Sequence, residues 1–170
     1  MDFDLDLILE EPPGRRTYMS MSHQEACRRL DKLRKELLPC SREIMDGHRF
    51  EVFAAVERML HILDVAREWG LVLLEEEERK LSESGSELEC FLAMGIKTEA
   101  LAKCSSMHNM FCAYDSSERS IWKDFIRYIY IRGVLMMNDG VSAQMAETVL
   151  LSLLPAEERR LFEKYQQHGE

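Results

Sequence analysis

One stretch decides the fold class of this chain: IWKDFIRYIYIRGVLMM, at residues 121–137. Residues 128–131 within it are aromatic and β-branched, a composition that by itself favours a strand. Over the longer window, Trp122, Ile126 and Ile129 recur at the three-and-four spacing of an α-helix. We therefore predict one helix through this stretch and, with it, an all-α fold.

The sequence on both sides of this stretch carries helix start and stop signals. Ser22 and Ser86 each open a capping box, with a Glu three residues later. Pro39 ends the first helix, and Gly47 is expected to interrupt the second. Thr98 can cap a later helix, residues 115–117 are expected to begin the next one, and Pro155 suits the first position of the last. We predict an irregular bundle of seven to eight helices in a single domain at residues 22–170. It follows an acidic, apolar tail and linker at residues 1–21.

The composition places the chain among ordinary globular proteins and limits its partners. Its 170 residues are 46% hydrophobic and 31% charged, enough for a self-sufficient core. The 31 acidic residues outnumber the 22 basic ones, for a net charge of −9. Such a balance argues against nucleic acid or an anionic membrane as the main partner. No 18-residue stretch is free of charge, so we expect no membrane insertion.

The cysteines and the N-terminus bear on location. The five cysteines are an odd number, and the first residues carry acids where a secretion signal needs Lys or Arg. Both features suit a reducing compartment better than a disulfide framework. We expect a cytoplasmic protein.

The strongest metal-like spacing is formed by Cys104, His108 and Cys112. On one helix these residues share a face, where three soft ligands could hold a metal ion, with Cys90 or His61 as a fourth. The same residues could instead serve a thiol enzyme. Against both, the segment also carries large apolar residues, and small cysteines are commonly buried in a core. We expect no bound cofactor.

No local motif of catalysis accompanies this spacing. The chain has no Gly-rich phosphate loop, no Gly-x-Ser-x-Gly and no His-Glu-x-x-His. The residue types of a nucleophilic triad are present, but without a local signature. A non-enzymatic role is therefore expected, and a metal-dependent or thiol enzyme is the alternative.

A second alternative rests on the basic residues at 28–35, RRLDKLRK. They form a positive helix face, which could bind nucleic acid and make the protein a regulator. No aromatic residue is interleaved to stack on bases. Internal pairing with the acidic run at 75–78, or with the acidic tail, is an equal interpretation.

The segment LDVAREWGLVLLE, at residues 63–75, resembles the cytoplasmic stretch of MotA-type flagellar stator proteins. An Arg, a Gly three residues on and a Leu-Glu pair recur there with this spacing. The resemblance implies that Arg67 and Glu75 face a protein partner, as the matching charges face the rotor. Both would lie on one face if the helix continues through Gly70. We expect a non-enzymatic protein–protein interaction module, a stator-like accessory component whose partner the sequence does not identify.

Overall fold

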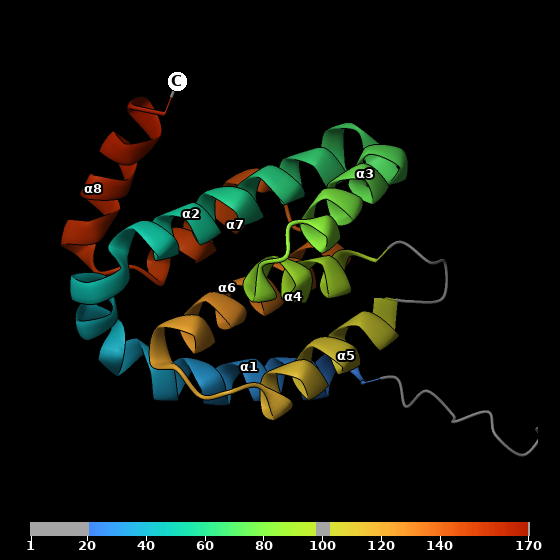
Figure 1. Cartoon of the computed structure of the whole chain (residues 1–170), viewed down its shortest axis with the longest axis horizontal. Helices are drawn as coiled ribbons and strands as arrows, with labels where there is room; N and C mark the ends of the chain where they lie inside the picture. The colour runs from blue at the N-terminus through green and yellow to red at the C-terminus, as the bar shows by residue number, and fades with distance from the viewer. Residues whose placement is uncertain (1–20, 98–102, 170) are drawn as a thin grey trace, which may run out of the picture.

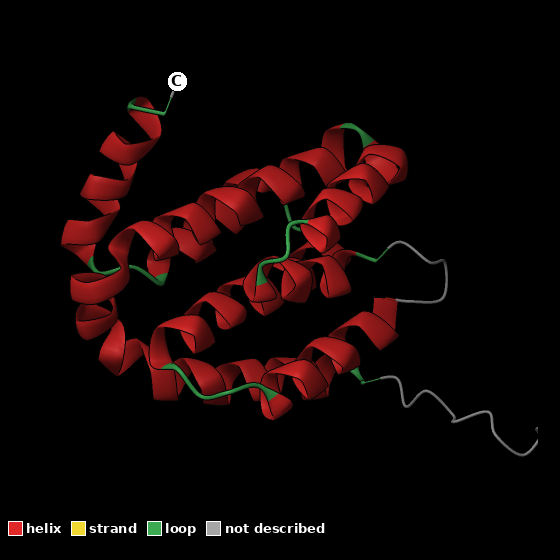
Figure 2. Ribbon diagram, viewed as in Figure 1, coloured by secondary structure: helices red, strands yellow, loops and turns green. Residues whose placement is uncertain are grey.

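The chain folds as an all-α bundle. A computed structural model describes residues 21–97 and 103–169, with the backbone alone for residues 103–105. Within these ranges the regular structure is helical throughout (Figure 2). The elements are α1 (His23–Leu37), the 3₁₀ turn η2 (Leu38–Cys40), α2 (Ser41–Glu68), α3 (Gly70–Glu83), α4 (Glu87–Ile96), α5 (Lys103–Ser116), α6 (Ile121–Asn138), α7 (Ala143–Ser152) and α8 (Ala156–Gln167). No helix in the described part of the chain is long and apolar enough to cross a membrane.

Helix α6 is the centre of the bundle, and it confirms the prediction for residues 121–137. It packs against α1, α2, α4, α5 and α7 (Figure 1). Its aromatic and β-branched residues 128–131 are buried on every side of the helix. A helix enclosed in this way needs no polar face, which explains why its composition resembles that of a buried strand.

Two glycines allow the helices to approach α6 closely. A Cβ at Gly133 would overlap the Met59 side chain of α2, and one at Gly95 would overlap Met110 of α5 and Val134 of α6. All three of these neighbours are buried. Larger residues at either glycine would therefore require these buried side chains, or the helices that carry them, to move in a close-packed core.

An ion network centred on the buried Arg127 fixes the first turns of α6. The Arg127 side chain is 1% exposed and donates to Asp124 at 2.9 Å and to Glu87 of α4 at 2.6 Å. Lys123 also pairs with Glu87, at 3.3 Å. These hydrogen bonds lower the pKa of Glu87, first through Lys123 and then through the charge of Arg127. The network ties α4 to α6.

Several helix boundaries agree with the sequence. The Ser22 and Ser86 hydroxyls accept hydrogen bonds from the Glu25 and Glu89 amides, at 3.1 and 3.4 Å. Pro39 lies in the turn after α1, and α2 kinks at His48, directly after Gly47. The core also includes Met21, which the sequence assigns to the tail.

Another predicted boundary is wrong. Residues 115–117 were expected to begin a helix, but α5 ends at Ser116 and α6 begins at Ile121. The hydroxyls of Ser116 and Ser117 donate back to the carbonyls of Cys112 and Tyr114, and so complete the end of α5. The expected cap at Thr98 lies outside the described residues.

Candidate functional site

The turn between α2 and α3 leaves apolar side chains in solvent. Trp69, Leu71 and Val72 are 65%, 65% and 76% exposed, beside a partly exposed Leu73. Gly70 between them has a φ of +70°, a left-handed conformation that glycine adopts without strain. The first inward residue of α3 is Leu74. We call residues 69–73 the α2–α3 corner.

Acidic residues surround the α2–α3 corner. Between residues 64 and 76 the chain has four acids, Asp64, Glu68, Glu75 and Glu76, and one base, Arg67. The Arg67 guanidinium lies 3.6 Å from Asp64 and 3.5 Å from Glu68. Further along α3, hydrogen bonds to Glu77 and then Glu76 raise the pKa of Lys80. The corner is an apolar patch with a negatively charged rim.

The predicted partner-binding residues Arg67 and Glu75 lie on either side of this corner. They do not share one helical face, because α2 ends at Glu68 and α3 starts afresh at Gly70. The reason is the left-handed φ of Gly70 at the start of α3, which breaks the right-handed path of the chain between the two helices. Arg67 is in the last turn of α2, and the exposed Glu75 follows the first inward residue of α3.

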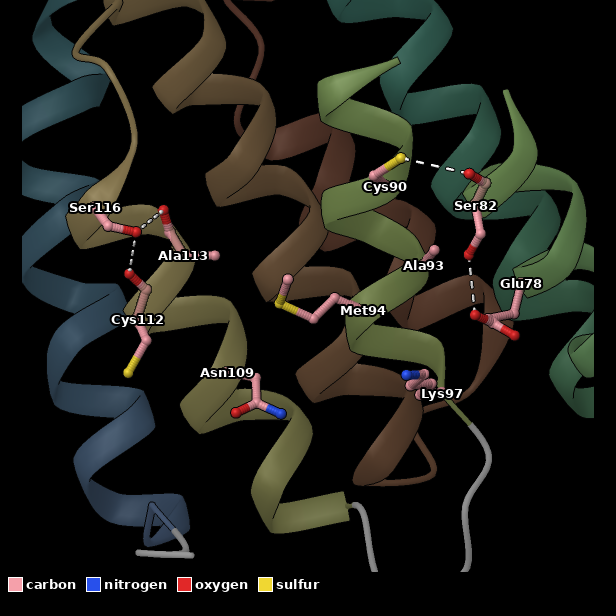
Figure 3. Close-up of a pocket in the computed structure, with 10 residues that line it drawn as sticks. All are labelled: Glu78, Ser82, Cys90, Ala93, Met94, Lys97, Asn109, Cys112, Ala113 and Ser116. Carbon is pink, nitrogen blue, oxygen red and sulfur yellow. Dashed lines mark hydrogen bonds between the residues drawn. The ribbon is translucent and has the colours of Figure 1, made fainter. Parts of the chain in front are cut away.

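A groove of about 560 Å³ lies between α3, α4 and α5 (Figure 3). Several of its polar groups bond to one another: Ser82 donates to Glu78 at 3.0 Å, and the Cys90 thiol to the Ser82 carbonyl at 3.7 Å. Cys112 lines the α5 side of the same groove. Glu78, Ser82 and Cys90 are therefore engaged with one another within α3 and between α3 and α4.

The predicted metal ligands are only partly brought together. Cys112 Sγ lies 3.5 Å from His108 Nε2, while the Cys104 side chain lies outside the described residues. Both proposed fourth ligands have other contacts, Cys90 in the groove and His61 with Glu77 at 3.5 Å. No three His, Cys, Asp or Glu side chains that the structure describes could hold a metal ion together.

The alternative of a buried cysteine is wrong for Cys112, which is exposed. Helix α5 turns a different set of residues inward: Met107, Met110, Phe111 and Tyr114. These apolar side chains occupy the core-facing side, so the His108–Cys112 pair lies away from it.

The basic residues of α1 have a partly structural role. The Arg29 guanidinium donates to both Asp115 oxygens, at 2.7 and 2.9 Å, and lies 4.3 Å from the Phe111 ring centre. It therefore joins α1 to α5. Within the acidic run at 75–78, the described contacts of Glu76, Glu77 and Glu78 do not include the expected pairing with α1. There, Glu76 and Glu77 pair with Lys80 of their own helix.

The sequence pattern alone does not distinguish the exposed corner from the core. Residues 71–74 are apolar in succession, and only Leu74 is buried. The available signal was the adjacent glycine, since residues at the start of a new helix need not continue the apolar face of the previous one.

Comparison of the chain with protein-family models, with curated proteins and with solved structures finds no match.

Proposed function

We propose that this protein binds another protein through the α2–α3 corner. The observation that carries the proposal is the exposure of Trp69, Leu71 and Val72, at 65% or more each, next to one another in the chain. Adjacent exposed apolar residues of this size mark interaction sites, and Trp is enriched among the residues that dominate binding energy.

The charge around the corner selects the kind of partner. An excess of carboxylates at the rim favours a segment that is apolar on one side and basic around it. The same charge disfavours an anionic membrane surface, which would be repelled. We therefore assign the corner to a basic amphipathic helix of a partner protein.

Trp69 offers a direct test. The chain has two tryptophans, and the other, Trp122, is stacked on His48 at 4.3 Å. In a Trp122→Phe background, a synthetic Leu/Lys amphipathic peptide should shift Trp69 emission to shorter wavelength as the indole leaves water. A Leu/Glu peptide of the same length and spacing should not. An equal response to both peptides, or to neither, contradicts the proposal.

Matched variants distinguish binding at the corner from nonspecific binding to exposed apolar side chains. Replacing Leu71 and Val72 together by Ser should weaken peptide binding by about tenfold, since two exposed anchors are lost. Phe50→Ser removes a side chain that is 70% exposed near the other end of α2, and it should leave binding unchanged. Sedimentation of the free protein tests whether a second copy of the chain occupies the corner. A dimer that the Leu71 and Val72 substitutions dissociate would show that the proposed partner class is wrong.

The charge reversal suggested by the stator resemblance tests the rim. Arg67→Glu with Glu75→Arg keeps the net charge but exchanges its positions. The fold should be retained, because the ion pairs of Arg67 join side chains that are at least half exposed and such pairs contribute little to stability. Unchanged peptide binding would remove both residues from the proposed site.

A further inference from the structure

We infer that Cys27 is a reactive thiol, activated by His23 and Asp139, which forms a mixed disulfide with small disulfide compounds. This site is separate from the α2–α3 corner and does not depend on its proposed function. Three side chains form the proposed site: His23 and Cys27 from the start of α1, and Asp139 from the end of α6. His23 and Asp139 are 116 residues apart in the sequence.

The three side chains form a continuous chain of contacts. Cys27 Sγ lies 3.7 Å from His23 Nδ1, and His23 Nε2 lies 2.9 Å from Asp139 Oδ2. Helix periodicity places His23 and Cys27 on one face of α1, and Asp139 follows the last turn of α6 as its C-cap. The thiol, the imidazole and the carboxylate are therefore ordered as nucleophile, base and orienting acid.

The carboxylate decides which imidazole nitrogen faces the thiol. A carboxylate only accepts hydrogen bonds, so His23 Nε2 must donate to Asp139. In the neutral ring this leaves the lone pair of Nδ1 directed at Cys27. Nδ1 can then accept the thiol proton, and Asp139 stabilises the imidazolium that results.

Two other described thiols donate hydrogen bonds to backbone carbonyls. Cys90 donates to the carbonyls of Leu81 and Ser82, at 3.9 and 3.7 Å, and Cys40 to that of Glu36 at 3.9 Å. The thiolate is the nucleophile, and among the described contacts neither of these thiols faces an imidazole that could accept its proton. Cys90 is exposed and Cys27 only partly so. Cys27 should therefore react faster than Cys90, although it is less exposed.

The reaction balances without a further reagent. The Cys27 proton passes to His23 Nδ1, and the thiolate attacks one sulfur of the small disulfide. One S–S bond breaks as another forms, and the departing thiolate takes the proton from His23. Cys27 is oxidised, and half of the small disulfide is reduced to a thiol. The side chain of His23 is 60% exposed, so a small molecule can approach the pair.

The test is site-resolved labelling of the folded full-length protein with glutathione disulfide at pH 7, followed by mass mapping. Cys27 should form the mixed disulfide at least tenfold faster than Cys90, despite its lower exposure. Labelling of Cys27 at the rate of Cys90, or more slowly, overturns the inference.

Variants distinguish activation from access. His23→Gln should slow labelling of Cys27 about tenfold and leave Cys112 unchanged, whereas the matched variant His108→Gln should leave Cys27 unchanged. A merely structural role of His23 predicts the opposite sign, because loosening α1 exposes Cys27 and speeds its labelling. Unchanged or faster labelling of Cys27 in His23→Gln overturns the inference.

Asp139 is a positioning residue, and it needs its own readout. Asp139→Asn retains the size of the side chain but loses its charge, and should slow Cys27 about threefold. Asp139→Glu should restore most of the rate. Equal rates in the Asn variant and the wild type would remove Asp139 from the site.

Discussion

Helices α1 and α5 carry the same His-x-x-x-Cys spacing, at residues 23–27 and 108–112, but the fold surrounds the two pairs differently. In both, the thiol and the imidazole lie within 3.7 Å of each other. Only His23 also meets a carboxylate, that of Asp139. Among the side chains that the structure describes, His108 has no acidic partner within ion-pairing distance.

The comparison separates a local effect from a tertiary one. One helical turn is enough to bring each Cys to its His, since residues four apart are neighbours on the helix surface. The third group must come from elsewhere: α6 ends beside the start of α1, while Cys112 of α5 lines the groove of Figure 3. The contacts also use different nitrogens, Nδ1 in His23 and Nε2 in His108.

The largest effect is expected from Arg127→Ala, which would release α6 and so remove the difference between the His23–Cys27 and His108–Cys112 pairs. This variant leaves Asp124, whose side chain is 9% exposed, without its main partner. The free energy of unfolding in urea should fall by about 3 kcal/mol. Once α6 is loosened, the labelling rate of Cys27 should become similar to that of Cys112.

The control is Arg119→Ala, because Arg119 reaches the same Asp124 at 3.8 Å from an exposed position. It should lower the unfolding free energy by less than about 1 kcal/mol. An equal loss in both variants would show that burial of Arg127 is not the cause.

A smaller effect is expected from Ser22→Ala, which would test the turn of α1 that holds His23. Loss of the N-cap hydrogen bond should cost about 1 kcal/mol of unfolding free energy. It should also slow labelling of Cys27, because the first turn no longer fixes the imidazole. Ser142→Ala removes the corresponding cap of α7 at Met145, and it should cost a similar amount without affecting Cys27.

The smallest effect concerns pH, and it tests the ion network of Glu87, Lys123 and Arg127 that joins α4 to α6. The pKa of Glu87 lies below its ordinary value of 4.5, mainly because Lys123 donates a hydrogen bond to it. The unfolded chain therefore binds this proton more readily, and the stabilisation is present above about pH 4.5 and lost as pH falls through the lower, folded value. Glu87→Gln should show a shallower loss of unfolding free energy in acid than the wild type.

Lys123→Ala tests the cause of this pH dependence. If its hydrogen bond lowers the pKa of Glu87, the acid slope should flatten in this variant too, while Glu87 remains present. A full wild-type slope in Lys123→Ala would assign the effect to Arg127 instead.

Much of the fold follows from local signals in the sequence. The caps at Ser22 and Ser86, the kink beside Gly47 and the helix through residues 128–131 were all predicted, because each depends on residues within a few positions. The start of α6 was not, since the serines before it bond back to α5. Such competition between two helix ends is decided by geometry that spacing does not encode.

The candidate sites were less accessible to prediction. Arg67 and Glu75 were identified through a resemblance, and the break at Gly70 changes how they are presented. Nothing in the sequence sets the exposed Leu71 and Val72 apart from core residues, because apolar character does not reveal which side of a new helix faces inward.

By itself, the sequence determined that this chain is helical, where most of its helices start, and that two histidines lie one turn from a cysteine. These are properties of neighbours along the chain, for which backbone geometry suffices. Only the tertiary structure decided that Asp139 meets His23, that Arg29 joins α1 to α5, and that the α2–α3 corner stays in solvent. Those contacts join residues far apart in sequence, or depend on which face of a helix is covered, and the packing of the whole bundle around α6 sets them.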